Sequence, residues 1–203
     1  MARGERSRPL EWGVATRTRP GEADAGDLAV VTRTGAGMLV AAIDGAGHGR
    51  EAARAARAGA DVLRDSPGDD LHALVLHCHE ALRETRGAAL SLAVFPDDLG
   101  LMTWVGIGNV QGAVFGDDGT VPRPKSVLRL TSGVVGHELS TVRRETLALC
   151  HGDVLVLATD GIHAALVDSL LLRGSPHEIA ERALEDHWKP EDDGLVLVVR
   201  YLG

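Results

Sequence analysis

Three aspartates stand at the ends of apolar segments, each close to a glycine, and they are the residues best suited to do chemistry. Asp44 follows the apolar run 38–43 and opens the glycine-rich stretch 45–49. Asp160 follows the run 154–159, and Asp192 stands just before the run 194–199. A carboxylate at the end of a buried strand is held rigidly, and neighbouring glycines let backbone carbonyls approach a ligand. Because carboxylate and carbonyl oxygens are the ligands that Mg²⁺ and Mn²⁺ prefer, the pattern favours a divalent-cation site.

The glycine-rich stretch taken alone leaves other interpretations open. Glycine turns between a strand and a helix often bind nucleotide phosphates, but the dinucleotide fingerprint and the Walker loop are both absent from this stretch. The acidic residue leads the motif instead. A second interpretation is a tight turn in which Asp44 caps the helix that follows.

The combination of three acids narrows the chemistry further. Carboxylates that converge without lysines repel one another, and a divalent cation removes that repulsion. Two such ions ~3.5–4 Å apart, bridged by one aspartate, would activate a water for attack on a phosphate ester. The sequence offers no cysteine phosphatase loop, no Ser-His-Asp elbow and no paired glycosidase carboxylates.

The hydrophobic pattern predicts the elements that position these acids. A hairpin of strands 28–34 and 38–43 would bring Asp27 and Asp44 to one end of a sheet, and an edge strand 11–16 precedes it. Helices are expected at 51–63, at 70–86, at 162–172 and after the capping box that begins at Ser175. Short apolar runs predict an antiparallel meander through 89–95, 99–105, 109–115, 127–131, 144–150 and 154–159, and a last strand at 195–199.

Composition sets the class and the compartment. The length of 203 residues suits a single domain over 11–203 after a disordered tail over 1–10. A net charge of −8 argues against nucleic acid or an anionic membrane as the main partner. No run approaches the ~20 apolar residues of a membrane span, so we expect a cytoplasmic protein. Cys78 and Cys150 lie in apolar contexts and are expected to be reduced core residues.

Five glycine-containing motifs stand in a fixed order along the chain: Asp44-Gly45-Ala46-Gly47-His48-Gly49, Gly106-Ile107-Gly108-Asn109-Val110, Gly133-Val134-Val135-Gly136, Ala158-Thr159-Asp160-Gly161-Ile162 and Asp192-Asp193-Gly194-Leu195. Together they resemble the motifs of the metal-dependent PPM (protein phosphatase 2C-like) serine/threonine phosphatases. The resemblance is to the small bacterial branch related to SpoIIE, and within it to the RsbX type of stressosome feedback phosphatase. It implies an α+β fold, a four-layer α/β/β/α sandwich of two antiparallel sheets flanked by helices.

The resemblance also implies a role for each matching position. Two divalent cations, Mn²⁺ or Mg²⁺, would be held by Asp44, the Gly45 carbonyl, Asp160 and Asp192. Asp27 would hydrogen-bond metal-bound water or substrate, and His48 would protonate the leaving seryl or threonyl oxygen. Asp193 matches a position that supports the ligands.

Two departures from the larger relatives stand out. Ala164 replaces a further acid four residues beyond Asp160, and a third metal is therefore not expected. Arg17 and Arg19 are the candidates for a phosphate-binding arginine before Asp27.

The expected function is dephosphorylation of a phosphorylated STAS-domain stressosome protein by a monomeric enzyme, on phosphoserine or phosphothreonine. Two alternatives stay open: a phosphatase of a stand-alone anti-sigma-factor antagonist, and a non-catalytic PPM-like binding module. Retention of the acidic cluster argues against the binding module, because unpaired acids have no physical use without a cation.

Overall fold

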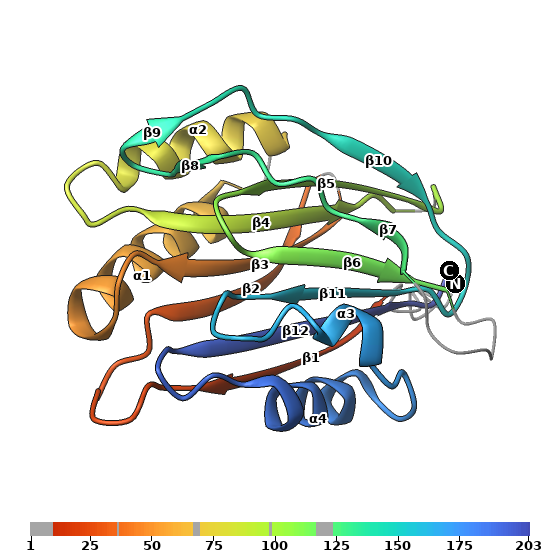
Figure 1. Ribbon diagram of the computed structural model, residues 1–203. Helices are drawn as coiled ribbons and strands as arrows, with labels where there is room; N and C mark the ends of the chain where they lie inside the picture. The colour runs from red at the N-terminus through yellow and green to blue at the C-terminus, as the bar shows by residue number, and fades with distance from the viewer. Residues whose placement is uncertain (1–9, 36, 67–69, 98, 117–123) are drawn as a thin grey trace, which may run out of the picture.

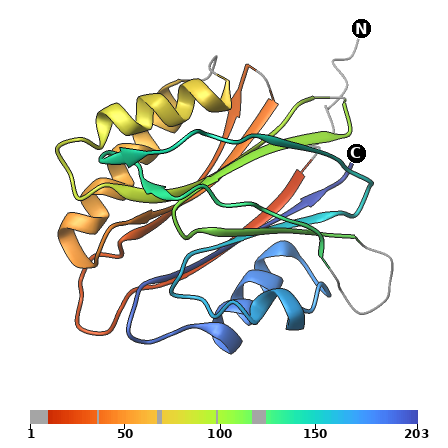
Figure 2. The same ribbon diagram turned by 45° about the horizontal axis from the view of Figure 1, so that its top comes forward.

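The structure is a computed structural model that describes residues 10–35, 37–66, 70–97, 99–116 and 124–203. Within these residues the chain forms two five-stranded antiparallel sheets with helices over both outer faces (Figure 1). Seen from a second direction, the sheets remain stacked and the helices remain outside them (Figure 2). This is the four-layer α/β/β/α sandwich expected from the sequence.

The first sheet carries Asp160 and Asp192 beside its central strands. Its five strands, in spatial order, are β1 (Leu10–Arg17), β12 (Gly194–Tyr201), β11 (Val154–Ala158), β6 (Gln111–Phe115) and β7 (Pro124–Val127). The second sheet carries Asp27 and Asp44 on neighbouring strands. Its order is β10 (Glu145–Ala148), β5 (Leu101–Ile107), β4 (Ala88–Phe95), β3 (Gly37–Gly45) and β2 (Asp27–Thr34). A short hairpin pairs β8 (Gly133–Val134) with β9 (Glu138–Leu139).

The helices divide between the two outer faces. Helices α1 (Gly49–Asp65) and α2 (Leu71–Ala81) cover the second sheet, and α3 (Leu166–Ser169) and α4 (Pro176–His187) cover the first (Figure 1). The buried face of α1 is mainly alanine, which lets the helix lie close to the sheet. The capping box expected at Ser175 is present: its hydroxyl accepts from the Glu178 N–H, and the Glu178 side chain accepts from the Ser175 N–H. None of the helices in the described ranges is long and apolar enough to cross a membrane.

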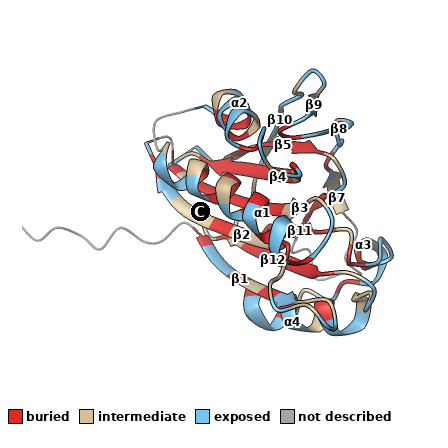
Figure 3. Ribbon diagram, turned by 90° about the vertical axis from the view of Figure 1, so that its left-hand side faces the viewer, coloured by how far each residue is buried: buried red, intermediate tan, exposed pale blue. Residues whose placement is uncertain are grey.

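Strand β3 shows why the sequence reads as an unbroken apolar run there. Alternate side chains point to opposite faces of a strand. Leu39, Ala41 and Ile43 therefore pack under α1 and α2, whereas Val40 and Ala42 pack between the two sheets. Both faces of the strand are buried, as the red central strands in Figure 3 show.

The expected single meander is wrong. Strands β4 and β5 do pair, but β5 and β6 belong to different sheets, and so do β10 and β11. The chain crosses between the sheets at Gly108, whose φ of +88° is a backbone conformation that glycine adopts without strain. The segment expected as a strand at 127–131 forms its strand earlier, as β7.

Two helix predictions are also corrected. The helix expected at 162–172 is reduced to the four residues of α3, because Ile162 is buried and forms a bridge with Trp188 while the His163 N–H donates to the His187 carbonyl. Helix α2 ends at Ala81 rather than Arg86, where the segment turns toward β4. Cys78 is buried as expected, but Cys150 is exposed. The expected tail at 1–10 lies outside the described residues up to Pro9, and β1 begins at Leu10.

Candidate active site

Asp27 and Asp44 face each other across one end of the second sheet. The β2–β3 register pairs them directly, with Asp27 as the first residue of β2 and Asp44 as the last but one of β3. The sequence places both acids at the same end because a hairpin with a short turn pairs the start of its first strand with the end of its second. The hairpin therefore brings both aspartates to one end of the sheet. From this end the chain continues from β3 into α1 (Figure 1).

The glycine-rich loop is fixed by backbone contacts on both sides. The Gly45 N–H donates to the Gly26 carbonyl and the Ala46 N–H donates to the Gly87 carbonyl. A side chain at Gly45 would collide with the backbone of Ala52 in α1, since an added Cβ would stand 2.1 Å from its carbonyl oxygen. Helix α1 has His48 as its N-cap residue, and no side chain caps it. The interpretation of Asp44 as a helix cap is therefore wrong.

Asp160 and Asp192 arrive from the first sheet. Asp160 follows β11 and Asp192 precedes β12, and these two strands are antiparallel neighbours that pair Ala158 with Val196. The end of one strand and the start of the other consequently lie at the same edge. The two connections touch there: a Cβ at Gly161 would stand only 1.7 Å from the Asp193 carbonyl oxygen.

A single pocket joins the two sheets at this edge. Its volume is about 400 Å³, and its lining includes the carboxylates of Asp44, Asp160 and Asp192. The remaining lining residues are small or apolar apart from one amide: Ala46, Gly47, Ala89, Gly108, Asn109, Gly133 and Val134. The structure thus gathers three of the predicted ligands in one place, although Asp44 precedes the other two by more than a hundred residues in sequence.

Burial and mutual repulsion raise the pKa values of aspartates at and beside the pocket. Burial, followed by the negative charges of Asp27, Asp160 and Asp192, raises the pKa of Asp44 to about 8. Burial is also the main cause that raises the pKa of Asp27 to about 7. The pKa of Asp192 is raised as well, first by burial and then by Asp160 and Asp193. The carboxylates of Asp27, Asp44 and Asp192 are therefore costly to ionise in the folded protein unless positive charge is added.

Supporting hydrogen bonds hold the acids in place. Asn109 donates its amide to Asp160 Oδ2 at 2.6 Å, and its hydrogen bond to Asp44 lowers the pKa of that group. Thr159 Oγ1 donates to Asp27 Oδ2 at 2.7 Å. The sequence marks Asn109 only as part of a glycine motif and does not predict its contact with Asp160. A polar residue between Gly108 and the buried Val110 was the one local signal of its role.

Asp193 is buried and acts on the backbone. Its two carboxylate oxygens accept from the N–H groups of Arg19 and Gly26, each at 2.8 Å. These bonds tie the segment before β2 to the segment before β12. The carboxylate is thereby occupied by backbone donors, which is the geometry of a residue that supports the site.

The donor set fits a hard divalent cation. Carboxylates of Asp44, Asp160 and Asp192 with the carbonyl of Gly45 are all-oxygen ligands, and the raised pKa values of Asp44 and Asp192 signal missing positive charge. Among the described residues, no group of three or more His, Cys, Asp or Glu side chains is arranged so that it could hold a metal ion by itself. Water and the Gly45 carbonyl would therefore have to complete the coordination of each ion.

His48 is not among the residues that line the pocket. Its Nδ1 lies 2.7 Å from Glu22 Oε1, and about half of its side chain is exposed. The structure therefore places the predicted proton donor at the rim, next to Gly47, with one ring nitrogen already engaged.

Of the two arginine candidates, Arg17 has its side chain engaged elsewhere, whereas Arg19 is engaged through its backbone. The Arg17 guanidinium stacks over the Trp188 ring, 5.2 Å from its centroid. Arg19 gives its backbone N–H to Asp193, and its charge lowers the pKa of Asp192. Ala164 is exposed in the connection before α3 and adds no ligand.

Comparison with known proteins assigns the family. The family model for stage II sporulation protein E (SpoIIE) matches residues 34–202. The chain belongs to the SpoIIE family.

Relatives of this SpoIIE-family chain are similar over its whole length. The phosphoserine phosphatase RsbX of Bacillus subtilis is 21% identical over 202 residues and is covered completely, as is this chain. A crystal structure of RsbX in complex with magnesium has a TM-score of 0.83 at 19% identity, covering 97% of this chain and 98% of the other. The fold is therefore that of the PPM phosphatases.

A second solved structure comes from work on the bacterial stressosome as a modular system adapted to control secondary messenger signalling. It is 29% identical, with a TM-score of 0.82, and covers 94% of this chain and 99% of its own. The similarity to both relatives thus spans nearly all of this SpoIIE-family chain and of each relative.

Proposed function

We propose that this SpoIIE-family chain is a metal-dependent phosphatase that hydrolyses phosphoserine or phosphothreonine in a STAS-domain protein of a stressosome. The observation that carries the proposal is the single pocket lined by Asp44, Asp160 and Asp192 from two different sheets. The similarity to a phosphoserine phosphatase and to a stressosome protein supports the substrate class.

The pocket suits two divalent cations, Mn²⁺ or Mg²⁺. Asp44, the Gly45 carbonyl, Asp160 and Asp192 would hold them, and the magnesium in the RsbX crystal structure supports this choice. When bound, such ions lower the pKa of a water and neutralise charge that develops on the phosphoryl oxygens. The chain's own contribution is orientation: Asn109 fixes the Asp160 carboxylate, and Thr159 fixes Asp27.

His48 carries the proposed proton transfer, and Asp27 the proposed hydrogen bond to metal-bound water or substrate. As an imidazolium, His48 would donate its Nδ1–H to the Glu22 carboxylate, which leaves the Nε2 proton for a leaving seryl oxygen. An aryl oxide leaves without a proton, whereas a seryl oxide does not. His48→Gln would therefore lower kcat for a phosphoserine peptide about tenfold or more and leave aryl phosphate hydrolysis nearly unchanged.

The test uses a phosphorylated STAS-domain scaffold protein of a stressosome as substrate. Phosphate release by the purified chain is measured with Mn²⁺, with Mg²⁺ and with chelator, beside Asp160→Asn. We expect release that depends on metal and is lost in the variant. Asp61→Asn, which changes an exposed acid on α1, is the matched control and should retain full activity.

Other outcomes separate the alternatives. Release from a stand-alone anti-sigma-factor antagonist, but not from the scaffold protein, would replace the substrate and keep the chemistry. Binding of the scaffold protein without hydrolysis of either substrate or of an aryl phosphate would favour a non-catalytic module and contradict the proposed activity.

A further inference from the structure

We propose that Arg86 binds the substrate's phosphoryl group at the rim of the metal pocket, a role for which the sequence alone offers Arg17 and Arg19. This inference rests on the proposed phosphatase function. The proposed phosphate-binding arginine lies in the connection between α2 and β4. The two candidates from the sequence, in contrast, lie before β2.

The position of Arg86 relative to the pocket is defined by Gly47. Gly47 lines the pocket, and a Cβ added to it would stand 2.9 Å from Nη1 of Arg86. The guanidinium therefore packs directly on a residue of the pocket wall. Gly47 has a φ of +89°, so the backbone also requires glycine there, and the missing side chain leaves room for the arginine.

The turn that presents Arg86 is held from three directions. The Gly87 carbonyl accepts from the Ala46 N–H of the glycine-rich loop, and the Gly87 N–H donates to Thr85 Oγ1. Ala88 forms a backbone bridge with Val135, beside the pocket residue Val134. The backbone of Arg86 is thus fixed to both walls of the pocket while its side chain stays exposed. Fixed backbone reduces the entropy lost when the side chain binds a ligand.

The guanidinium of Arg86 is available, unlike those of Arg83, Arg57 and Arg54. Arg83 pairs with Glu80 at 2.9 Å, Arg57 pairs with Asp24 at 2.9 Å, and Arg54 donates to the Glu84 carbonyl. Across the described ranges of the chain, the Arg86 side chain makes no hydrogen bond or ion pair. An unpaired guanidinium beside a pocket is planar and can donate two parallel hydrogen bonds to a phosphate.

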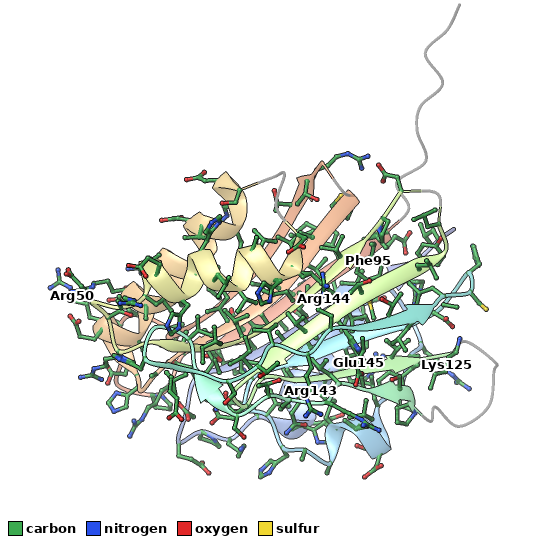
Figure 4. The ribbon with its side chains drawn as sticks, turned by 90° about the horizontal axis from the view of Figure 1, so that it is seen from above. Arg50, Phe95, Lys125, Arg143, Arg144 and Glu145 are labelled. Atoms are coloured by element: carbon green, nitrogen blue, oxygen red, sulfur yellow. The ribbon has the colours of Figure 1, made fainter. Side chains whose placement is uncertain are left out.

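The negative charge of the pocket explains why a cationic side chain is needed at its rim. A phosphorylated side chain carries a charge of about −1.5 to −2, and it must enter a pocket lined by three aspartates. Bound cations offset the aspartates, and a further positive group at the rim favours the arriving dianion. Lys125, the labelled cation at the opposite end of the molecule from Arg50, is paired with Asp153 and cannot serve this purpose (Figure 4).

The experiment uses inorganic phosphate as a ligand of the pocket. Calorimetry gives its affinity for the magnesium-loaded protein, and inhibition of aryl phosphate hydrolysis gives its inhibition constant. Arg86→Ala should weaken both about tenfold, and should raise KM for a phosphoserine peptide more than it lowers kcat. Arg86→Lys, which keeps the charge and loses the fork, should recover only part of the affinity.

The control is Arg50→Ala. Arg50 lies in the first turn of α1, and its side chain extends outward from the body of the molecule (Figure 4). The Arg50→Ala variant loses the same charge near the same loop, and its phosphate affinity and phosphate inhibition constant should equal those of the wild type. Magnesium affinity and thermal unfolding should match those of the wild type in all of these variants.

Three outcomes decide between the proposals. Hydrolysis and phosphate binding that stay within twofold of wild type in Arg86→Ala would overturn the role of Arg86 and leave the phosphatase function intact. A tenfold loss in Arg19→Ala, with Arg86→Ala unaffected, would overturn it in favour of Arg19. Phosphate binding that depends on Arg86 in a chain without hydrolytic activity would support the binding role and contradict the proposed function.

Discussion

Replacing Asp44 by asparagine is expected to stabilise the protein when no metal is bound. The pKa of Asp44 is raised from 3.8 to about 8 in the folded chain. The group is then protonated in the folded state and ionised in the unfolded chain between these two values, so stability is lost as the pH rises through that window. Asparagine cannot ionise and avoids this loss.

The size of the effect follows from the same shift. A tenfold change in proton affinity corresponds to ~1.4 kcal/mol, so the penalty that Asp44 imposes reaches up to ~5 kcal/mol at pH 8.5 and about 1.5 kcal/mol at pH 5. For a chain of this length, 1 kcal/mol moves Tm by about 2–4 °C. Asp44→Asn should therefore raise Tm by up to ~20 °C at pH 8.5 and by several degrees at pH 5.

The assay is thermal unfolding followed by circular dichroism in chelator, at pH 5, 7 and 8.5. Saturating Mn²⁺ should reverse the order, because the wild type gains binding free energy that the variant has lost. Asp61→Asn relieves the same net charge at an exposed position and should shift Tm by no more than a degree or two. A variant of Asp44 that is less stable than wild type in chelator at pH 8.5 would refute the reasoning.

Three further predictions concern the residues that support the site. Asp193→Ala should lower the free energy of unfolding by about 2–4 kcal/mol, because the Arg19 and Gly26 N–H groups lose their acceptors; Asp193→Asn, which keeps one acceptor, should cost less, as urea titration would show. Thr159→Val removes the donor that lowers the pKa of Asp27, so the stability lost in chelator should be about 1–3 kcal/mol and larger at pH 8.5 than at pH 5. Gly161→Ala should abolish Mn²⁺ binding in calorimetry, because its Cβ would overlap the Asp193 carbonyl and displace Asp160; an alanine variant with wild-type affinity would contradict this packing.

The part of the site that sequence predicts well is the part that depends on local geometry. Asp27 and Asp44 are brought together by one short hairpin, and Asp160 and Asp192 flank two buried strands, so position along each strand is enough to place them. Asn109 and Arg86 could not be placed in this way. Asn109 meets Asp160 across 51 positions of sequence, and Arg86 meets Gly47 only because the α2–β4 turn folds onto the glycine-rich loop.

The errors in the fold have a related cause. Strands β5 and β6 are both buried apolar runs, and such runs carry no information about which sheet they join. The helix expected at 162–172 has a suitable composition, but tertiary contacts prevail: Ile162 bridges to Trp188 instead of beginning a helix. The capping box at Ser175 succeeds because both of its hydrogen bonds are local.

The most direct test of the account is the number of divalent ions bound by the purified chain. Mn²⁺ binding to the chelator-treated protein is measured by calorimetry, with electron paramagnetic resonance of the free ion as a second count, for the wild type and for Asp44→Asn. Two ions per chain, with uptake of metal accompanied by proton release at pH 7 and lost in the variant, is the result that the raised pKa of Asp44 predicts. A wild-type chain that binds no Mn²⁺, or an Asp44→Asn variant that binds it equally well, would contradict the metal site on which the proposed function depends.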